Sequence, residues 1–185
     1  MFTLMNLMND LFKDVKVKIK SFNSINDNPC YISYYESGNI KCEMWFREGM
    51  LFRENNLPSC IVYFDNLEKS ISQKFWYISS DTDFFCLESN HKLHNEGDNP
   101  AHVEYYESGN IKLEIWYKND EIKRVGDLPA IISYYDLPNK NVKFELWEKN
   151  INRIQPHAIG YYPSGNVKML FWEKGECIKK EYADL

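Results

Sequence analysis

The sequence contains few cysteines, and none of them stands in a Cys-x-x-Cys pair. Five cysteines are scattered along 185 residues, and the chain has no Asn-x-Ser/Thr acceptor for N-glycosylation. Small secreted domains rely on paired cysteines, and structural zinc sites need closely spaced ones. These absences predict an intracellular, cytoplasmic protein without a disulfide framework.

Long apolar runs and an excess of positive charge are missing as well. No stretch approaches the roughly 20 apolar residues of a transmembrane helix, and the N-terminus lacks the basic and apolar regions of a signal peptide. With 22 basic and 27 acidic side chains, the formal net charge is −5. Nucleic acid, whose phosphates require a basic surface, is therefore not an expected partner.

The chain also lacks the motifs that carry common chemistries. It has no phosphate-binding loop, no nucleophile–base–acid set and no zinc pattern. His91 and His94 are spaced as two metal ligands on a helix would be, but no third ligand stands at a diagnostic interval, so a structural role is expected. We expect no catalytic residue, no metal and no cofactor, and the chain is not expected to be an enzyme.

The sequence is rich in aromatic side chains, and it is repeated. Aromatic residues make up 16% of the chain, which favours β structure, and the octapeptide YYESGNIK occurs at 34–41 and again at 105–112. Each of five prolines is followed five places on by an aromatic pair and, further along, by a tryptophan. These positions define five units, which begin at Pro29, Pro58, Pro100, Pro129 and Pro156 and contain Trp45, Trp76, Trp116, Trp147 and Trp172. Units one and two match units three and four at one constant offset, which indicates a duplicated two-unit block.

Residues alternate in character within each unit, as expected for two strands. In the second arm of unit three, Ile111, Leu113 and Ile115 are interleaved with Lys112 and Glu114. Such a period of two is typical of a half-buried strand. We expect one aliphatic face and an opposite face that bears lysine, glutamate and tryptophan.

Turn signals separate the two arms of every unit. The sequence ESGN or PSGN lies between the arms of units one, three and five, and its glycine can adopt the positive φ of a bulged hairpin loop. A second reversal follows each tryptophan, as in FREGM at 46–50 and YKNDE at 117–121. The pattern predicts an all-β fold, an elongated single-layer antiparallel meander of repeated β-hairpins.

The two ends and one insertion interrupt the repeat. Residues 2–12 carry apolar side chains at helical spacing, so a short amphipathic helix and an edge strand at 15–20 are expected to form an N-terminal cap over 1–28. The five units occupy 29–176, with an insert at 78–90 that contains Phe84 and Phe85. Residues 177–185 are expected to supply a closing strand and a tail.

The repeated elements YYESGNIK, IWYKND at 115–120 and HKLHNEGDNPA at 91–101 resemble MORN-type repeats, in particular the longer tryptophan-bearing variant of large DNA viruses of amoebae. The resemblance covers about residues 28–180, although the Asn-Gly and Asp-Gly turns of the family pattern remain only as fragments. It implies an elongated sheet of hairpins that acts as a non-catalytic scaffold for protein contacts. It also implies a viral setting, as a virion component or a host-interaction protein in the host cytoplasm.

The expected binding surface consists of aromatic side chains. The candidate partner-binding residues are Trp45, Trp76, Trp116, Trp147, Trp172, Tyr35, Tyr106, Tyr135, Phe84 and Phe85. A structural role, as rings that stack across neighbouring hairpins, is the favoured interpretation of these aromatic side chains, and partner binding is the functional alternative. Three functions stay open: a protein-binding scaffold, a carbohydrate- or membrane-surface-binding module that uses the rings or residues 2–12, and an antitoxin-like inhibitor. Free strand edges also offer a route to a homo-oligomer.

Overall fold

The computed structural model describes residues 23–79, 91–148, 156–172 and 180–181. Within these ranges the regular structure consists of β-strands alone, so the predicted all-β class is confirmed. The expected helix at 2–12, the edge strand at 15–20 and the rings of Phe84 and Phe85 lie outside the described residues.

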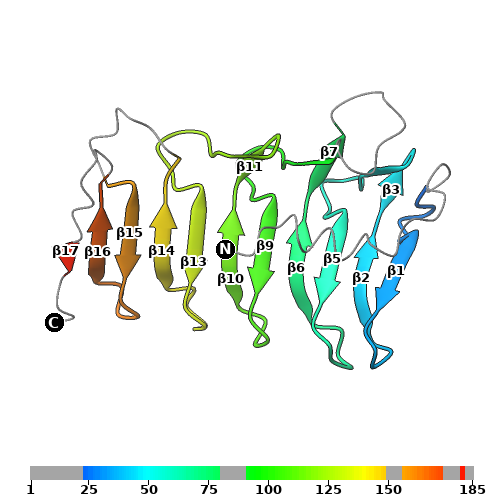
Figure 1. The fold of residues 1–185 in the computed structure, drawn as a ribbon, viewed down its shortest axis with the longest axis horizontal. Coiled ribbons are helices and arrows are strands. Elements are labelled where there is room, and N and C mark those ends of the chain that lie inside the picture. Colours follow the sequence, from blue (N-terminus) through cyan, green and yellow to red (C-terminus); the bar gives the residue numbers. More distant parts are fainter. Residues whose placement is uncertain (1–22, 80–90, 149–155, 173–179, 182–185) are drawn as a thin grey trace.

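One antiparallel sheet of eleven strands runs through the molecule in chain order (Figure 1). The strands lie side by side as a meander of hairpins, and the sheet is much longer across the strands than along them. Its strands are β1 (Tyr31–Tyr34), β2 (Ile40–Met44), β5 (Cys60–Tyr63), β6 (Ile71–Phe75), β9 (His102–Tyr105), β10 (Ile111–Ile115), β13 (Ile131–Tyr134), β14 (Val142–Leu146), β15 (Ala158–Tyr161), β16 (Val167–Phe171) and β17 (Lys180–Glu181).

Every unit forms one hairpin with the same irregularity next to its turn. In units one, three and five the turn glycines Gly38, Gly109 and Gly165 have φ of 88°, 86° and 91°, which glycine adopts without a steric penalty. The longer turns of units two and four place Lys69 and Lys140 at φ of 53° and 54° instead. A bulge follows in all five hairpins, so the predicted loop geometry is confirmed.

The reversals after Trp45, Trp76 and Trp116 form a second tier of short hairpins rather than simple turns. In the part of the chain that the structure describes, three two-stranded pairs lie outside the main sheet: β3 (Phe46–Arg47) with β4 (Met50–Leu51), β7 (Tyr77–Ser79) with β8 (His91–Leu93), and β11 (Tyr117–Lys118) with β12 (Glu121–Ile122). They line one margin of the sheet (Figure 1), and β4 packs against β7. The segment expected as an insert, 78–90, begins with two residues that belong to β7.

The expected separation into an aliphatic face and a tryptophan face holds only in part. Glu43 of β2 lies directly opposite Ile61 of β5, so an acidic and an aliphatic side chain share a face. Trp45 packs on the same side, in a cluster with Ile61 and Tyr63. The bulge adds one residue to the second arm, which turns Ile40 toward this cluster. We call this side the tryptophan face.

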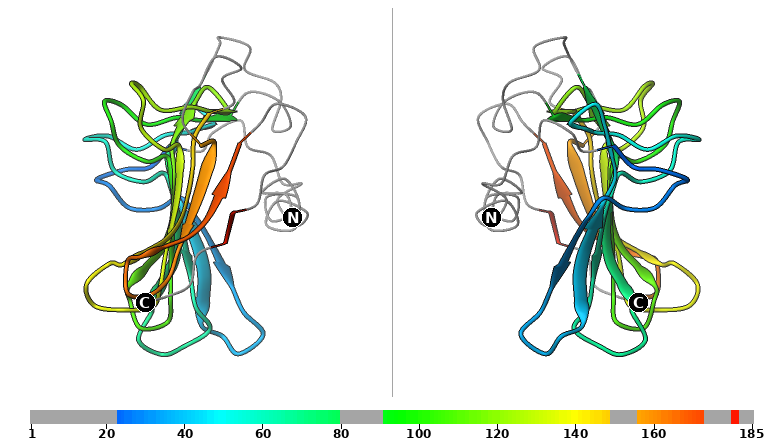
Figure 2. Two further views of the ribbon diagram at one scale, coloured as in Figure 1. Left: turned by 90° about the vertical axis from the view of Figure 1, so that its left-hand side faces the viewer. Right: turned by 90° about the vertical axis from the view of Figure 1, so that its right-hand side faces the viewer.

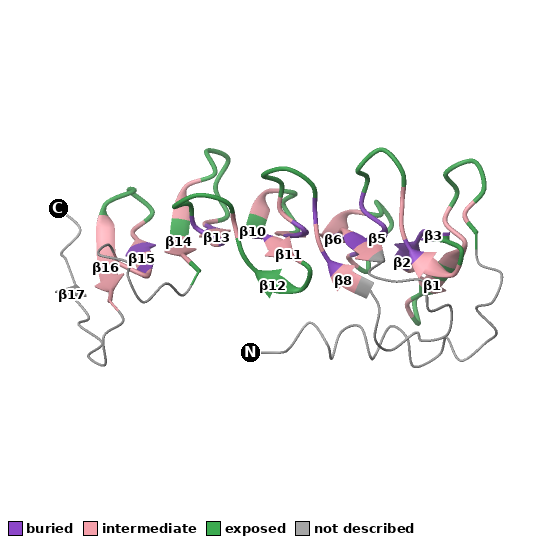
Figure 3. Cartoon of the chain, turned by 90° about the horizontal axis from the view of Figure 1, so that it is seen from above, coloured by how far each residue is buried: buried purple, intermediate pink, exposed green. Residues whose placement is uncertain are grey.

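The opposite side, which we call the core face, carries the larger apolar cluster. It joins the sheet to the second-tier hairpins, because Met44 and Phe75 of the sheet pack with Leu51, Tyr77 and Leu93. All of these residues are buried, and Figure 3 shows most of the buried segments in or next to the strands, whereas the long loops are largely exposed. The short second-tier hairpins therefore cover part of the apolar surface that a bare sheet would leave in water.

Candidate functional site

The five predicted tryptophans occupy one repeated position, but they differ in exposure. Trp45 and Trp116 are 3% and 6% exposed, whereas Trp76, Trp147 and Trp172 are half-buried. The indole N–H groups of the first four units donate hydrogen bonds to backbone carbonyls of the preceding loop, at Asp27, Asn56, Asp98 and Asp127. Trp45 and Trp116 thus hold the loop before each unit against the sheet and present little indole surface to a partner.

An arginine clamp, which the sequence analysis did not identify, completes the tryptophan site of unit one. Arg53 forms a two-pronged ion pair with Asp27, in which both N–O distances are 2.7 Å, and its guanidinium lies 3.8 Å from the centroid of Trp45. It also donates a hydrogen bond to the carbonyl of Pro58. One side chain thereby joins the loop before unit one, the indole of unit one and the start of unit two.

Unit three repeats the clamp with the same geometry. Arg124 pairs with Asp98 at 2.7 Å for both N–O contacts and lies 3.8 Å from the centroid of Trp116. In unit two the equivalent position is Asn95, whose amide donates to the carbonyl of Pro100. The two aspartates and the two arginines are related by the offset of the duplicated block. This relation is the signal that could have identified the clamp, since the chain has few arginines.

The clamps predict a loss of stability in acid. The hydrogen bonds from Arg53 and Arg124 lower the pKa values of Asp27 and Asp98 below the ordinary 3.8. A carboxyl with a lowered pKa in the folded chain stabilises it fully above its unfolded pKa, and this contribution is lost as the pH falls through the folded pKa. We therefore expect the melting temperature to fall as the pH is lowered below about 4.

The double variant Asp27→Asn/Asp98→Asn tests this assignment in melting curves recorded at stepwise lower pH. We expect the variant to melt lower at neutral pH and to lose less on acidification. Asp65 and Asp136 also have lowered pKa values, through hydrogen bonds from neighbouring turns, so some acid sensitivity remains. An unchanged slope of melting temperature against pH would show that the clamps do not carry the effect.

The second aromatic residue of each pair also connects neighbouring hairpins. Tyr35, Tyr106 and Tyr135 are half-buried, and each hydroxyl donates to the carbonyl of the first aromatic residue in the next unit, over 2.7–2.9 Å. Lysine ammonium groups lie over these rings as well, 5.9 Å from the centroid for Lys41 over Tyr35 and 5.7 Å for Lys143 over Tyr135. These three predicted partner-binding residues thus have their hydroxyls engaged within the chain, and two of them have part of a ring face engaged as well.

A tyrosine–glutamate–lysine set with a largely buried carboxylate recurs on the tryptophan face. Tyr134 donates to a carboxylate oxygen of Glu114 at 2.5 Å, and Lys140 lies 3.1 Å from the same oxygen. Tyr63, Glu43 and Lys69 form the same set in the first block. Burial, and then the neighbouring glutamate, raises the pKa of both tyrosines well above the ordinary value, so the phenol stays a donor at every physiological pH.

Removing the hydroxyl of Tyr134 is expected to destabilise the sheet. Tyr134→Phe leaves the largely buried Glu114 carboxylate with one donor fewer, which should lower the free energy of unfolding by about 1–2 kcal/mol. Tyr105 occupies the same position in unit three but lies 5.2 Å from the ammonium of Lys74 and has no hydroxyl hydrogen bond within the described residues. Tyr105→Phe should therefore change stability by less than about 0.5 kcal/mol. Urea unfolding compares the two variants, and equal losses would contradict the assigned role.

The junction between units two and three departs from the repeat. Lys74 stands where the neighbouring junctions have glutamate, and Phe64 stands where they have a hydrogen-bonding tyrosine. On the core face, His102 stacks on Phe75 with ring centroids 4.4 Å apart, and its Nε2 lies 3.2 Å from the side-chain oxygen of Gln73. Burial lowers the pKa of His102 to about 3, so its ring is neutral at physiological pH and packs as an aromatic side chain.

Two surface features remain that the hydrogen bonds and ring contacts described above do not explain. The first is a row of exposed apolar side chains in the loops before the prolines, which we call the proline-loop row: Ile25, Leu57, Val125 and Leu128. Figure 2 shows these loops projecting from one side of the sheet.

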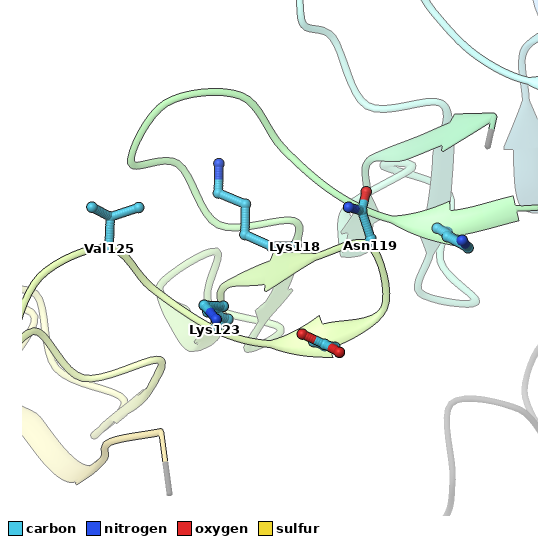
Figure 4. Close-up of a pocket in the computed structure, with 6 residues that line it drawn as sticks. Lys118, Asn119, Lys123 and Val125 are labelled. Atoms are coloured by element: carbon cyan, nitrogen blue, oxygen red, sulfur yellow. The ribbon is translucent and has the colours of Figure 1, made fainter. Parts of the chain in front are cut away.

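The second feature is an open hollow of about 530 Å³ beside the β11–β12 hairpin (Figure 4), lined by Lys92, Lys118, Asn119, Glu121, Lys123 and Val125. Val125 belongs to both the hollow and the row, so the two features form one continuous surface.

Comparison of the chain with protein-family models, with curated proteins and with solved structures finds no match. Within the described residues, no group of three or more histidine, cysteine, aspartate or glutamate side chains is arranged to hold a metal ion. No helix in the same residues is long and apolar enough to cross a membrane.

Proposed function

We propose that this chain is a non-enzymatic repeat scaffold that binds a protein partner along the proline-loop row. The observation that carries the proposal is the exposure of Ile25, Leu57, Val125 and Leu128. Exposed apolar side chains that gather on one side of a molecule, instead of being scattered, are typical of protein interaction surfaces. Hydrogen bonds from tryptophan and arginine side chains to the loops that carry this row hold these loops in place, which limits the entropy lost on binding.

The position of the row follows from the repeat. Leu57 and Leu128 both stand immediately before a unit proline and occupy the same position in the two copies of the block. The duplication therefore presents the same side chain twice along the sheet. Repeat proteins commonly use such regularly spaced contacts to bind an extended surface. We therefore assign the working surface to the loops and a supporting role to the predicted tryptophans.

Binding of carbohydrate through the aromatic strip is less favoured. A sugar ring would stack on a free aromatic face, whereas lysines lie over Tyr35, Tyr135 and Tyr162, with the ammonium of Lys168 at 5.4 Å from the last ring. Membrane contact through residues 2–12 rests on a segment outside the described residues. The resemblance to MORN-type repeats agrees with a scaffold. We also propose the viral setting that the resemblance implies, in the virion or in the host cytoplasm. An antitoxin-like inhibitor stays an alternative form of this proposal.

Two matched leucine pairs test the proposal. Leu57→Ser/Leu128→Ser alters the proline-loop row, and Leu67→Ser/Leu137→Ser removes two exposed leucines from the turns at the other ends of the strands. Each tagged variant is used to capture partners from the native source, and bound proteins are identified by mass spectrometry. We expect the same partner to be retained by the wild-type chain and the turn variant and lost by the row variant. Equal retention by both variants, or capture of no protein by the wild-type chain, would contradict the proposal.

A further inference from the structure

We propose that the hollow beside the β11–β12 hairpin binds an acidic peptide segment whose carboxylates alternate with apolar side chains. This inference rests on the proposed function, because it names the chemistry of the partner at one end of the proline-loop row. Three observations carry it: a fixed frame, a local excess of lysine, and the divergence of this hairpin from its copy in unit one.

The frame is a pair of hydrogen bonds between two second-tier hairpins. The backbone N–H of Leu93 in β8 donates to the carboxylate of Asp120 at 2.6 Å, and the N–H of Asp120 donates to the carbonyl of Leu93 at 3.0 Å. Asn119 and Asp120 form the tight turn between β11 and β12, with φ of 54° and 69°. Lys92 on one hairpin and Lys118 on the other are therefore held on a common frame.

The lining of the hollow is positively charged on an otherwise acidic chain. Three lysines and one glutamate line it, although the formal charge of the whole chain is −5. Lys123 lies 3.7 Å from a carboxylate oxygen of Glu148, but both side chains are about half exposed, so water weakens this pair and the lysine remains able to bind an anion. Figure 4 shows Lys118 and Val125 extending to the same side, with Lys123 seen nearly end-on between them.

The equivalent hairpin of unit one, β3–β4, differs from the β11–β12 hairpin in the burial of its side chains. When the two copies of the block are aligned, Leu51 stands in place of Ile122 and Phe52 in place of Lys123, and Leu51 is fully buried in the core. In unit three the copy exposes Ile122 and replaces a neighbouring apolar ring by an ammonium group. The two copies of the hairpin therefore differ: in unit one the hairpin packs into the core, and in unit three it exposes charged and apolar side chains.

The mixed lining favours a peptide over a lone phosphate. Phosphate sites commonly use arginine forks or the backbone N–H groups of a helix N-terminus, and neither lines this hollow. An extended acidic segment matches it better, because carboxylates can meet the lysines while an alternate apolar side chain contacts Val125.

Fluorescence anisotropy with a fluorescein-labelled peptide of alternating glutamate and valine tests the inference. The variant Lys92→Gln/Lys118→Gln/Lys123→Gln removes the three lysines of the hollow. The control Lys41→Gln/Lys143→Gln/Lys168→Gln changes the net charge by the same amount at lysines that lie over tyrosine rings. We expect the wild-type chain and the control to bind alike, and the hollow variant to bind roughly tenfold or more weakly.

Four outcomes would overturn the inference. They are the absence of binding by the wild-type chain, equal weakening in both variants, equal binding of a peptide in which glutamine replaces glutamate, and displacement of the acidic peptide by inorganic phosphate at a similar concentration. Melting curves of both variants confirm that each is folded. If these outcomes occur while the leucine pair of the proline-loop row still controls partner capture, the hollow is excluded and the proposed function stands.

Discussion

Replacing Phe75 by alanine is expected to lower the free energy of unfolding by about 3–5 kcal/mol. The side chain is fully buried on the core face, where its ring stacks on His102 and lies 6.2 Å from the ring of Tyr77. Removing it opens a cavity at the junction that lacks the tyrosine–carbonyl hydrogen bond and the tyrosine–glutamate contact of its neighbours. It also takes away the ring against which the neutral imidazole packs. Equilibrium unfolding in urea measures the loss.

The matched control is Phe171→Ala, because Phe171 precedes Trp172 as Phe75 precedes Trp76. Phe171 is only half-buried, so its replacement should cost about 1–2 kcal/mol. Hydrogen exchange adds a spatial test, since amides of β5, β6 and β9 should lose protection in Phe75→Ala and keep it in Phe171→Ala. Similar losses of unfolding free energy in Phe75→Ala and Phe171→Ala would show that burial of Phe75 on the core face does not contribute more to stability than the half-buried Phe171.

Replacing Arg53 by alanine is expected to cost about 2 kcal/mol, through the loss of the ion pair and of the guanidinium–indole contact. The largely buried Arg53 side chain joins three segments of chain, so its removal breaks all of these contacts at once. Arg53→Lys should recover little, because an ammonium group cannot form the two-pronged pair and lie flat on the ring. Arg124→Ala should give a similar loss, since the clamp of unit three has the same distances.

Arg47→Ala is the control for the clamp. Arg47 lies 3.8 Å from Glu54, with both side chains largely exposed, and such a pair contributes less than about 1 kcal/mol. Thermal and urea unfolding of Arg53→Ala, Arg124→Ala and Arg47→Ala separate the two classes. If Arg47→Ala destabilised the chain as much as Arg53→Ala, general charge balance would explain the effect and the clamp would not.

The hairpins of the main sheet could be predicted because their signals are local. The octapeptide YYESGNIK contains a strand end, a glycine at positive φ and the start of the returning strand within one short segment. The assignment of faces was less successful, because the bulge beside each turn adds one residue and moves Ile40 to the tryptophan face. Alternation along a strand assigns side chains to the two faces correctly only up to a bulge, so the position of the bulge must be known to assign the residues beyond it.

The second tier and the clamps could not be predicted in the same way. Strands such as β3 and β4 have two residues each, too few for any periodicity, and they form because Phe46 and Leu51 pack on the core face. Arg53 meets Asp27 across 26 residues of chain, a distance that no local pattern covers. Only the comparison of the two copied blocks could have paired these residues before the structure was known.

The agreement between chain order and strand order has a mechanical consequence. Tension applied across the ends of the sheet meets one pair of strands at a time, and the hydrogen bonds of each antiparallel pair open in succession. The molecule should therefore lengthen in small steps at low force and should refold hairpin by hairpin when the load is removed. If a partner were bound at one end of the sheet and the other end were anchored, the connection between them would extend under low force.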